Sequence, residues 1–547
     1  MNEITVSLET LATLAALEGR PLAQDANNLD TLLTDIASRY AFLARPISVE
    51  VRNAKAFIRW ADRPSEDQTQ AHRLLRRAGR RAQEGHYERV ATLCRQALQL
   101  QPSLHAARRE LARACMQAGD GVNAIATFWQ ILRLDAGDIG AILGLGWLLL
   151  REGGHESAEG LARMALAREP SNPDLLDFLG QALVLAGRES EALGVFGRAL
   201  LLNPHAPGPR LGAGKALFQQ GKPEESRAQL EELFNQGGRA EGPRPAPPFV
   251  AAARDLYVEV QRHLARRDLD PVRQTLREFR RRLEVEYGVP ICVTWFEEEE
   301  PSWVQFAWTC GRDHHLVGGP ACLPELAQLH LLAQQLVRIE LEAEACRADK
   351  LRIFCPSTAQ DPSDLALFTG VAHDLRRQGF GQGVIHRTIQ QASDLVRAMV
   401  CNLPLDMLIE RRLRTHLPIL APAQFLSLRG SMGESGKVRD DDLARLLRGL
   451  PQPLRRPALA MEGAWRLFCD ELLSGAADFS VPCRDLPTFD LSLRLLRQWE
   501  ASAAQVGPGS HYGLVDGFAS MLGLGGLYEL REVHMEHKGS AEQAFAA

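Results

Sequence analysis

The sequence holds several residue types that can act as nucleophiles or metal ligands, but few stand at the spacing that such chemistry needs. The ten cysteines form no CxxC pair, so neither a zinc ribbon nor a thioredoxin-type redox site is expected. A cysteine nucleophile is weakly supported, because neither Cys355 nor Cys401 lies in a recognisable local signature. The stretch RRQGFGQGVIH contains GxGxG but follows a predicted helix rather than a strand, so it predicts a helix-ending loop.

A polar group on one predicted helix calls for closer chemical reading. Apolar periodicity predicts a long amphipathic helix at about 323–350, and this helix carries Gln334, Gln335 and Arg338. Glutamine is a neutral amide that ligates Zn²⁺ poorly and cannot act as a base. His330 shares a face with Gln334, because the two are four residues apart. His330, a distant histidine and Glu410 could in principle bind Zn²⁺, but a lone histidine on an apolar helix is more often packed.

The elements around this helix resemble the catalytic domain of zincin metallopeptidases over about residues 285–430. The resemblance rests on two predicted strands (GVPICVTWF and SWVQFAWTC), the helix with its LLAxxLVxIELEAEA pattern, and the later stretches CNLPLDMLIERRL and PAQFLSL. In that family the helix carries HExxH, whose histidines bind Zn²⁺ and whose glutamate activates the metal-bound water. The resemblance places Gln334 and Arg338 at the two histidines and Gln335 at the general base. Glu410 then stands where a third ligand would lie.

These departures imply a pseudo-enzyme that keeps the fold and has lost the metal, with no catalytic residue and no cofactor. Arg338 would place a permanent positive charge where a dication should sit. At about 4 Å that repulsion is several kcal/mol even at an effective dielectric near 20. Arg338 would instead suit a salt bridge to Glu410 or Glu340. The alternative is an active zinc metallopeptidase that uses substitute ligands, with a repeat region earlier in the chain selecting the substrate.

A repeat of 34 residues dominates the region before this domain. Gly supplies the unusual backbone angles of a short turn between antiparallel helices, and Pro ends a helix. Small residues allow the paired helices to approach closely. Such residues recur at a fixed step in three series: the turn glycines Gly85, Gly119, Gly153, Gly187 and Gly221; the second ladder Gly146, Gly180 and Gly214; and the repeat ends Pro102, Ala136, Pro170 and Pro204. The pattern resembles the tetratricopeptide repeat (TPR) and covers about residues 71–238 in five units.

A stack of such repeats is a curved solenoid whose concave groove typically holds a protein or peptide partner. The Lys, Asn and Arg clamp with which some TPR proteins hold a chaperone tail is not matched in either frame of three repeats, so that partner is not expected. Gly140, Gly144 and Trp147 indicate an open and partly apolar groove. The candidate groove residues are Arg109, Arg113, Trp147 and Phe178, although ordinary packing between repeats is the favoured interpretation of Trp147.

The remaining segments complete a mainly α fold: a TPR α-solenoid, a zincin-like α+β domain and further helices. We expect a helical N-terminal region at 1–70, the solenoid at 71–238, a Gly/Pro linker at 239–249, the zincin-like domain at 250–439 and an α-rich C-terminal region at 440–547. The Arg-rich helix at 273–282 is interpreted as a solvated face paired with neighbouring glutamates. The acidic run Glu297–Glu300 is interpreted as a solvated hairpin tip.

Composition limits the classes of function. The 547 residues are 45% hydrophobic and 24% charged, which is typical of a globular protein. The formal net charge of −5 makes nucleic acid an unlikely partner. No apolar run is long enough for a membrane span, and the N-terminus lacks an export signal, so a cytoplasmic location is expected. The sequence therefore predicts a non-catalytic scaffold that binds a protein or peptide, with a place in a bacterial stress or defence system suggested by analogy alone.

Overall fold

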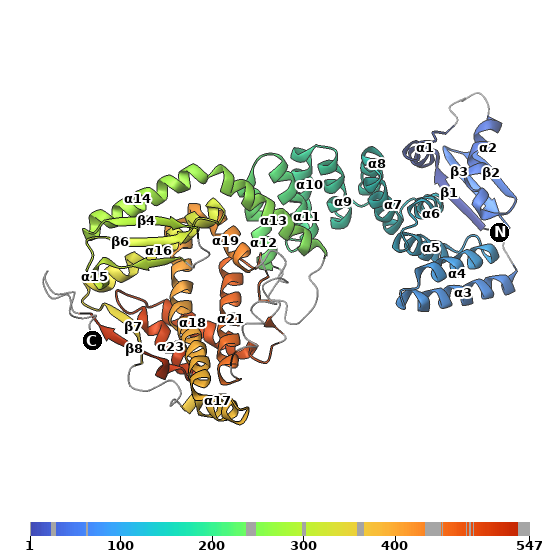
Figure 1. The fold of residues 1–547 in the computed structure, drawn as a ribbon. Helices are drawn as coiled ribbons and strands as arrows, with labels where there is room; N and C mark the ends of the chain where they lie inside the picture. Colours follow the sequence, from blue (N-terminus) through green and yellow to red (C-terminus); the bar gives the residue numbers. More distant parts are fainter. Residues whose placement is uncertain are drawn as a thin grey trace. The chain divides into compact units, whose positions relative to one another are not determined.

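The protein is mainly helical and divides into two compact units, residues 1–229 and 230–547 (Figure 1). The computed structural model describes residues 2–22, 29–61, 64–236, 248–297, 302–357, 366–432, 450, 452–476, 478–480, 483–484 and 486–533. Among these residues, no helix combines the length and the apolar character that a membrane crossing requires. Most of the predicted 239–249 linker and the predicted acidic hairpin tip lie outside the described residues.

The first unit begins with a small α/β segment rather than helices alone. Its elements are β1 (Asn2–Ser7), α1 (Leu8–Leu17), α2 (Leu29–Arg39), the short 3₁₀ turn η1 (Ala41–Leu43), β2 (Ile47–Arg52) and β3 (Lys55–Trp60). The antiparallel sheet has the order β1-β3-β2. Asn53 and Ala54 both have positive φ, which is the geometry of a tight two-residue hairpin turn. The prediction of a helical region at 1–70 is therefore wrong for its strands, of which β2 (ISVEVR) alternates apolar and polar residues.

This segment packs against helices of the repeat region and belongs to the same unit. Tyr40 is buried and its hydroxyl donates to the carbonyl of Arg133 at 2.8 Å. The guanidinium of Arg133 also pairs with Glu18. The hydroxyl of Ser157 donates to the carbonyl of Leu17 at 3.0 Å. These contacts tie the N-terminal segment to the second helices of two repeats.

The repeat region forms five antiparallel helix pairs. They are α3 (Ser65–Gln83) with α4 (Tyr87–Leu100), α5 (His105–Gln117) with α6 (Gly121–Leu134), α7 (Ile139–Arg151) with α8 (His155–Leu166), α9 (Pro173–Leu185) with α10 (Glu189–Leu202), and α11 (Pro207–Gln219) with α12 (Pro223–Gln236). All five predicted turn glycines have φ between 73° and 85°, in the left-handed region that only glycine adopts freely. The 34-residue periodicity is confirmed.

The second glycine ladder allows aromatic rings to pack into the helix surfaces. A Cβ at Gly146 would overlap the ring of Phe178, which is fully buried. We expect Gly146→Ala to destabilise the first unit by about 1–3 kcal/mol, because a well-packed core has no room for an added methyl group. Thermal or denaturant unfolding of the full chain measures this effect.

A matched control lies in the next repeat along the chain. Gly197 is exposed in the middle of α10, and an added Cβ there meets no atom within 4 Å. Gly197→Ala should stabilise the protein by up to about 1 kcal/mol, because alanine has the higher helix propensity. Equal effects of the two substitutions would show that ring packing does not require the glycine at position 146.

The second unit combines helices with two small sheets. Its first part holds α13 (Pro248–Arg267), α14 (Leu269–Tyr287), β4 (Ile291–Phe296), β5 (Trp303–Gln305), α15 (Ala307–Cys310), β6 (His315–Pro320), α16 (Glu325–Arg347) and β7 (Arg352–Pro356). The sheet order is β4-β6-β5, with β4 parallel and β5 antiparallel to β6. The predicted strand at GVPICVTWF and the long helix are confirmed, whereas SWVQFAWTC is a strand for three residues only. On α14, Arg280 pairs with Glu284 at 3.0 Å, as the solvated-face interpretation predicts.

The rest of the unit closes around α16. It holds α17 (Ala366–Arg377), α18 (Gln382–His416), η3 (Pro418–Leu420), α19 (Ala421–Met432), α21 (Gln452–Leu472), α22 (Phe489–Ala503), α23 (Tyr512–Leu522), η5 (Gly525–Leu527) and β8 (Tyr528–Glu532). Helix α16 packs against α14, α18, α19 and β6. Strand β8 pairs with β7, and the indole of Trp499 donates to the carbonyl of Pro404 at 2.9 Å. Residues 230–547 form one compact unit, which includes the described residues on both sides of the predicted division at 439/440.

Candidate functional site

The first helix of each repeat presents one row of equivalent positions. Counting the 34-residue step from Arg113 on α5 gives Trp147 on α7, Gln181 on α9 and Lys215 on α11. The side chain of Arg113 is largely exposed and pairs with Glu110. Trp147 is 46% exposed, and its ring packs edge-on against Phe178 with 5.5 Å between ring centroids. Lys215 forms no ion pair with any residue that the structure describes. The row therefore places two basic side chains, Arg113 (paired with Glu110) and Lys215, on either side of an exposed aromatic ring and an amide.

Two of the predicted groove residues serve other purposes. Phe178 is fully buried and fills the space above Gly146, so the prediction that it contacts a partner is wrong. In the sequence, Phe178 occupies a position equivalent to one of the clamp residues that line the groove in some TPR proteins. Arg109 donates its Nε to Asp138 at 2.6 Å, and its charge is thereby engaged within the solenoid. Trp147, which was favoured as a packing residue, both packs and remains exposed.

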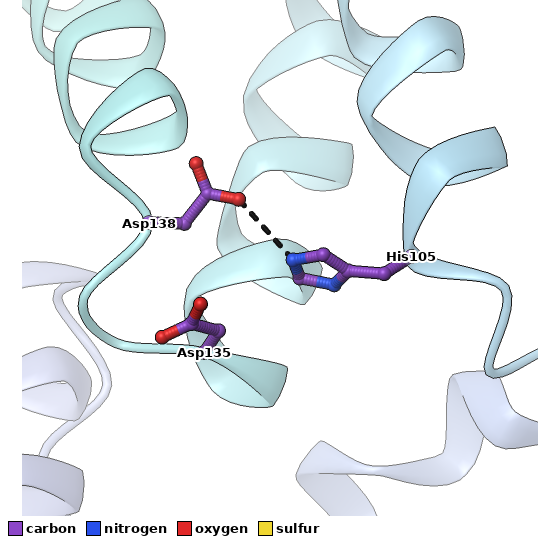
Figure 2. A group of neighbouring side chains, drawn as sticks. All are labelled: His105, Asp135 and Asp138. Atoms are coloured by element: carbon purple, nitrogen blue, oxygen red, sulfur yellow. Dashed lines mark hydrogen bonds and ion pairs between the residues drawn. The ribbon is translucent and has the colours of Figure 1, made fainter.

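A histidine and two aspartates meet between the second and third repeats (Figure 2). His105 opens α5, and Asp135 and Asp138 lie in the connection between α6 and α7. The imidazole of His105 points at Asp138, with 3.2 Å between Nε2 and Oδ2. Ligand atoms of the three residues lie within 4.8 Å of one another. Sequence reasoning missed this group, although its members stand about one repeat length apart.

The contacts of His105, Asp135 and Asp138 favour a role in stabilising the junction between repeats over a role in binding a cation. Asp138 caps α7 by accepting from the backbone N–H of Ala141 at 3.0 Å, and its other oxygen accepts from both His105 and Arg109. Asp135 accepts from the N–H of Gly137 at 3.0 Å. A cation would have to displace or tolerate the guanidinium of Arg109, which opposes it electrostatically. The contacts instead stabilise the junction between adjacent repeats.

In the second unit, a buried carboxylate accepts hydrogen bonds from two glutamines and a histidine. Glu410 on α18 is fully buried and accepts from Gln334 on α16, from His330 on α16 at 3.1 Å between Nε2 and Oε2, and from Gln424 on α19 at 2.6 Å. We call these four residues the Glu410 cluster. Two of the residues singled out from the sequence, Gln334 and Glu410, are therefore in direct contact. Gln424 was not singled out, and its place within the PAQFLSL stretch is the signal that could have found it.

Arg338 does not form the predicted electrostatic tie. Its Nη2 donates to the side-chain oxygen of Asn402 at 3.1 Å, and no described carboxylate lies within ion-pair distance of it. Glu340 pairs instead with Arg282 on α14 at 2.5 Å. The prediction of a salt bridge from Arg338 to Glu410 or Glu340 is therefore wrong, because His330 and the two glutamines already occupy the oxygens of Glu410. Gln335 is buried and donates to the hydroxyl of Ser302 at 3.3 Å.

Two carboxyl groups one turn apart on α18 shift in opposite directions. Burial raises the pKa of Glu410, but the neighbouring His330 and the donated hydrogen bonds outweigh it, so the net pKa is lowered. Burial raises the pKa of Asp406 to about 6; the charge of Arg338 opposes this shift and that of Glu410 adds to it. Glu410 is therefore held as a carboxylate, while Asp406 takes up a proton in mildly acidic solution.

Asp406 gives the second unit a pH dependence that can be measured. Because its folded pKa of about 6 exceeds the ordinary value of 3.8, the folded state loses stability as the pH rises through about 4 to 6. We expect Asp406→Asn to raise the melting temperature at pH 7 and to leave it nearly unchanged at pH 4. Calorimetry of both proteins across this range measures the difference. An equal gain at both pH values would contradict the shift.

Comparison with known proteins identifies the repeats. Residues 143–209 and 183–241 match tetratricopeptide repeat family models. A search of curated proteins finds no match. Similar solved structures include a thermophilic TPR protein of Thermus thermophilus (20% identity, 35% of this chain and 98% of the other, TM-score 0.29) and pilF of Pseudomonas aeruginosa (18%, 37% and 93%, 0.29). Another is YrrB, described as a TPR protein with an unusual peptide-binding site (17%, 32% and 90%, 0.28). The family-model matches show that the chain contains TPR repeats, which are typical of protein-interaction scaffolds.

Proposed function

We propose that this protein is a non-catalytic interaction scaffold whose solenoid binds an extended, acidic segment of a protein partner. The exposed ring of Trp147 carries the proposal, because a large aromatic side chain is costly to leave in water and is a frequent centre of binding energy. Arg113 and Lys215, at equivalent positions in the row, supply positive charge on both sides of it. A partner with carboxylates flanking an apolar residue complements this row.

The second unit adds a pseudo-metallopeptidase to this proposal. The Glu410 cluster supports it: where the resemblance would place a zinc ion, the carboxylate accepts hydrogen bonds from two amides and an imidazole. The neutral amides donate hydrogen bonds to the carboxylate, but an amide is a poor ligand for Zn²⁺. The alternative, an active metallopeptidase with substitute ligands, would need His330 and Glu410 to exchange these bonds for a metal. We therefore propose that this unit acts by binding rather than by hydrolysis.

Selection from a displayed library of random peptides tests the solenoid. We expect the full chain to select peptides rich in Asp and Glu around one apolar residue. Trp147→Ala should lower the affinity for a selected peptide by roughly tenfold or more, which is the effect expected of a central aromatic contact. Arg113→Gln and Lys215→Gln should each lower the peptide affinity by a smaller factor, and each should make that affinity less dependent on salt concentration.

The matched control is an apolar side chain exposed on a second helix. Leu201 on α10 is 84% exposed, so Leu201→Ala removes a similar surface outside the row. Peptide affinity should stay unchanged in that variant. Peptides that bind the Trp147→Ala and wild-type proteins equally would contradict the proposed groove.

A further inference from the structure

A pocket of about 320 Å³ lies within the second unit, apart from the repeats. Its walls come from α15 and the residue before it, from α16, from β7 and from α18. The volume lies at the lower end of the range typical of small-molecule sites, which suits a ligand about as large as one amino acid. Arg338 and Asn402 both line it. The arginine that the sequence singled out is therefore part of the pocket wall and does not contact Glu410.

The pocket wall contains hydrogen-bond donors that the described residues leave without acceptors. The Nε of Arg338 and the indole Nε1 of Trp308 are both buried and have no hydrogen-bond partner. Both Asp406 and Glu410 lie beyond 4.0 Å from the guanidinium of Arg338. Buried donors without partners are costly and uncommon in native proteins. A carboxylate in the pocket would give the guanidinium of Arg338 a charged acceptor.

The other two arginines of the wall are already neutralised. Arg397 pairs with Asp394 at 2.7 Å, and Arg352 pairs with Glu532 at 3.0 Å. Arg338 is therefore the one wall arginine, among the described residues, that lacks a carboxylate partner. One unpaired guanidinium matches a single carboxylate better than a phosphate dianion, and it repels a metal cation.

The two carboxylates of the wall are also engaged. Asp394 is held by Arg397, as described above. Glu342 on α16 accepts from the hydroxyl of Tyr512 at 2.5 Å, and its other oxygen lies 3.7 Å from the imidazole of His511. Because both carboxylates already have partners, the guanidinium of Arg338 remains available to an anion that enters the pocket.

The remaining wall is apolar and aromatic. The rings of Phe306 and Trp308 stack with 5.7 Å between centroids and 10° between planes. Leu351, Ile353 and Phe354 contribute from β7 and the residue before it. A ligand that places its carboxylate at the guanidinium would lay an apolar body against these side chains, where burial of apolar surface adds to its affinity.

We propose that this pocket binds a carboxylate carried on an apolar or aromatic body of about one residue, with the carboxylate held by Arg338 and the apolar body against the aromatic wall that includes Trp308. The same chemistry belongs to a free aromatic acid and to the C-terminal residue of a peptide. The proposal depends on neither the repeats nor the zincin resemblance, because it uses only the unpaired donors, the pocket and its apolar wall.

Calorimetric titration of the full chain with N-acetyl-phenylalanine tests it, with N-acetyl-phenylalanine amide as the uncharged comparison. We expect the acid to bind at least tenfold more tightly than the amide. A peptide of several residues ending in Phe distinguishes the two sources: tighter binding of the peptide assigns the pocket to a C-terminus, and equal or weaker binding assigns it to a free acid. Equal binding of acid and amide, or binding of neither, would overturn the proposal.

Two variants and a control locate the contact. Arg338→Gln should lower the affinity for the acid at least tenfold. Asn402→Asp should have the same effect, because it supplies Arg338 with an internal carboxylate. Arg347→Gln removes an arginine of α16 that lies outside the pocket wall and is paired with Glu286, so it should change the affinity less than twofold. The melting temperature of each variant establishes that it is folded. Unchanged binding in both test variants, or an equal loss in all three, would overturn the assignment to Arg338.

Discussion

Glu410→Ala should destabilise the second unit by about 3–5 kcal/mol, the cost typical of breaking a buried charged network by removing one partner. The substitution leaves His330, Gln334 and Gln424 without their shared acceptor in the protein interior. It also creates a cavity, because the side chain is fully buried. Denaturant unfolding of the full chain, followed by a signal from the second unit, measures the loss.

Two further substitutions separate the network from ordinary surface charge. Glu410→Gln keeps the volume and one acceptor oxygen, so its cost should be smaller than that of Glu410→Ala. Glu286 forms an exposed ion pair with Arg347 at 3.1 Å, and Glu286→Ala should cost no more than about 1 kcal/mol. If Glu410→Ala cost as little as Glu286→Ala, the cluster would not stabilise the fold.

The triple variant Gln334→His, Gln335→Glu and Arg338→His should gain about one zinc ion per chain. It removes the guanidinium charge and places two imidazoles one turn apart on α16. The side chain at position 334 already contacts Glu410, which supports Glu410 as the third ligand. Elemental analysis of the purified, dialysed protein measures the metal, with the wild-type protein treated in parallel.

The same triple variant with Glu410→Gln added is the matched control, and it should lose most of the bound zinc because an amide is a weak ligand. Circular dichroism and melting temperatures establish that both variants are folded. A folded triple variant that takes up no zinc would count against the proposed relation to zincin peptidases. It would leave the carboxylate pocket and the solenoid proposal unaffected.

The repeats were the most predictable part of the fold because their signal is local. Each turn glycine adopts the left-handed conformation that favours glycine, as the repeat pattern predicts; Gly153, for example, has φ of 85°. The N-terminal strands were missed although Ile47–Arg52 and Lys55–Trp60 flank a two-residue turn, because the neighbouring helical periodicity was extended over them. The strand β6 was missed because His315–Pro320 contains two glycines and a terminal proline, which are typical of a loop.

The candidate site was less predictable because it depends on distances across the fold. The sequence indicated Gln334 and Glu410. Which side chains donate to the buried carboxylate of Glu410 depends on how α16, α18 and α19 pack together. His330 and Gln424 take the place that was expected for Arg338. Side-chain competition of this kind leaves no periodic pattern to read.

The pairing of β7 with β8 has a consequence for how the protein is made. Arg352 and Glu532 are joined across this ladder although they are 180 residues apart in the chain. During synthesis at about 5–20 residues per second, β7 would wait roughly 10–40 s for its partner. For that interval it is an unsatisfied template to which another nascent chain can add. Slower translation of the intervening segment should therefore increase aggregation, and a chaperone that covers β7 should reduce it.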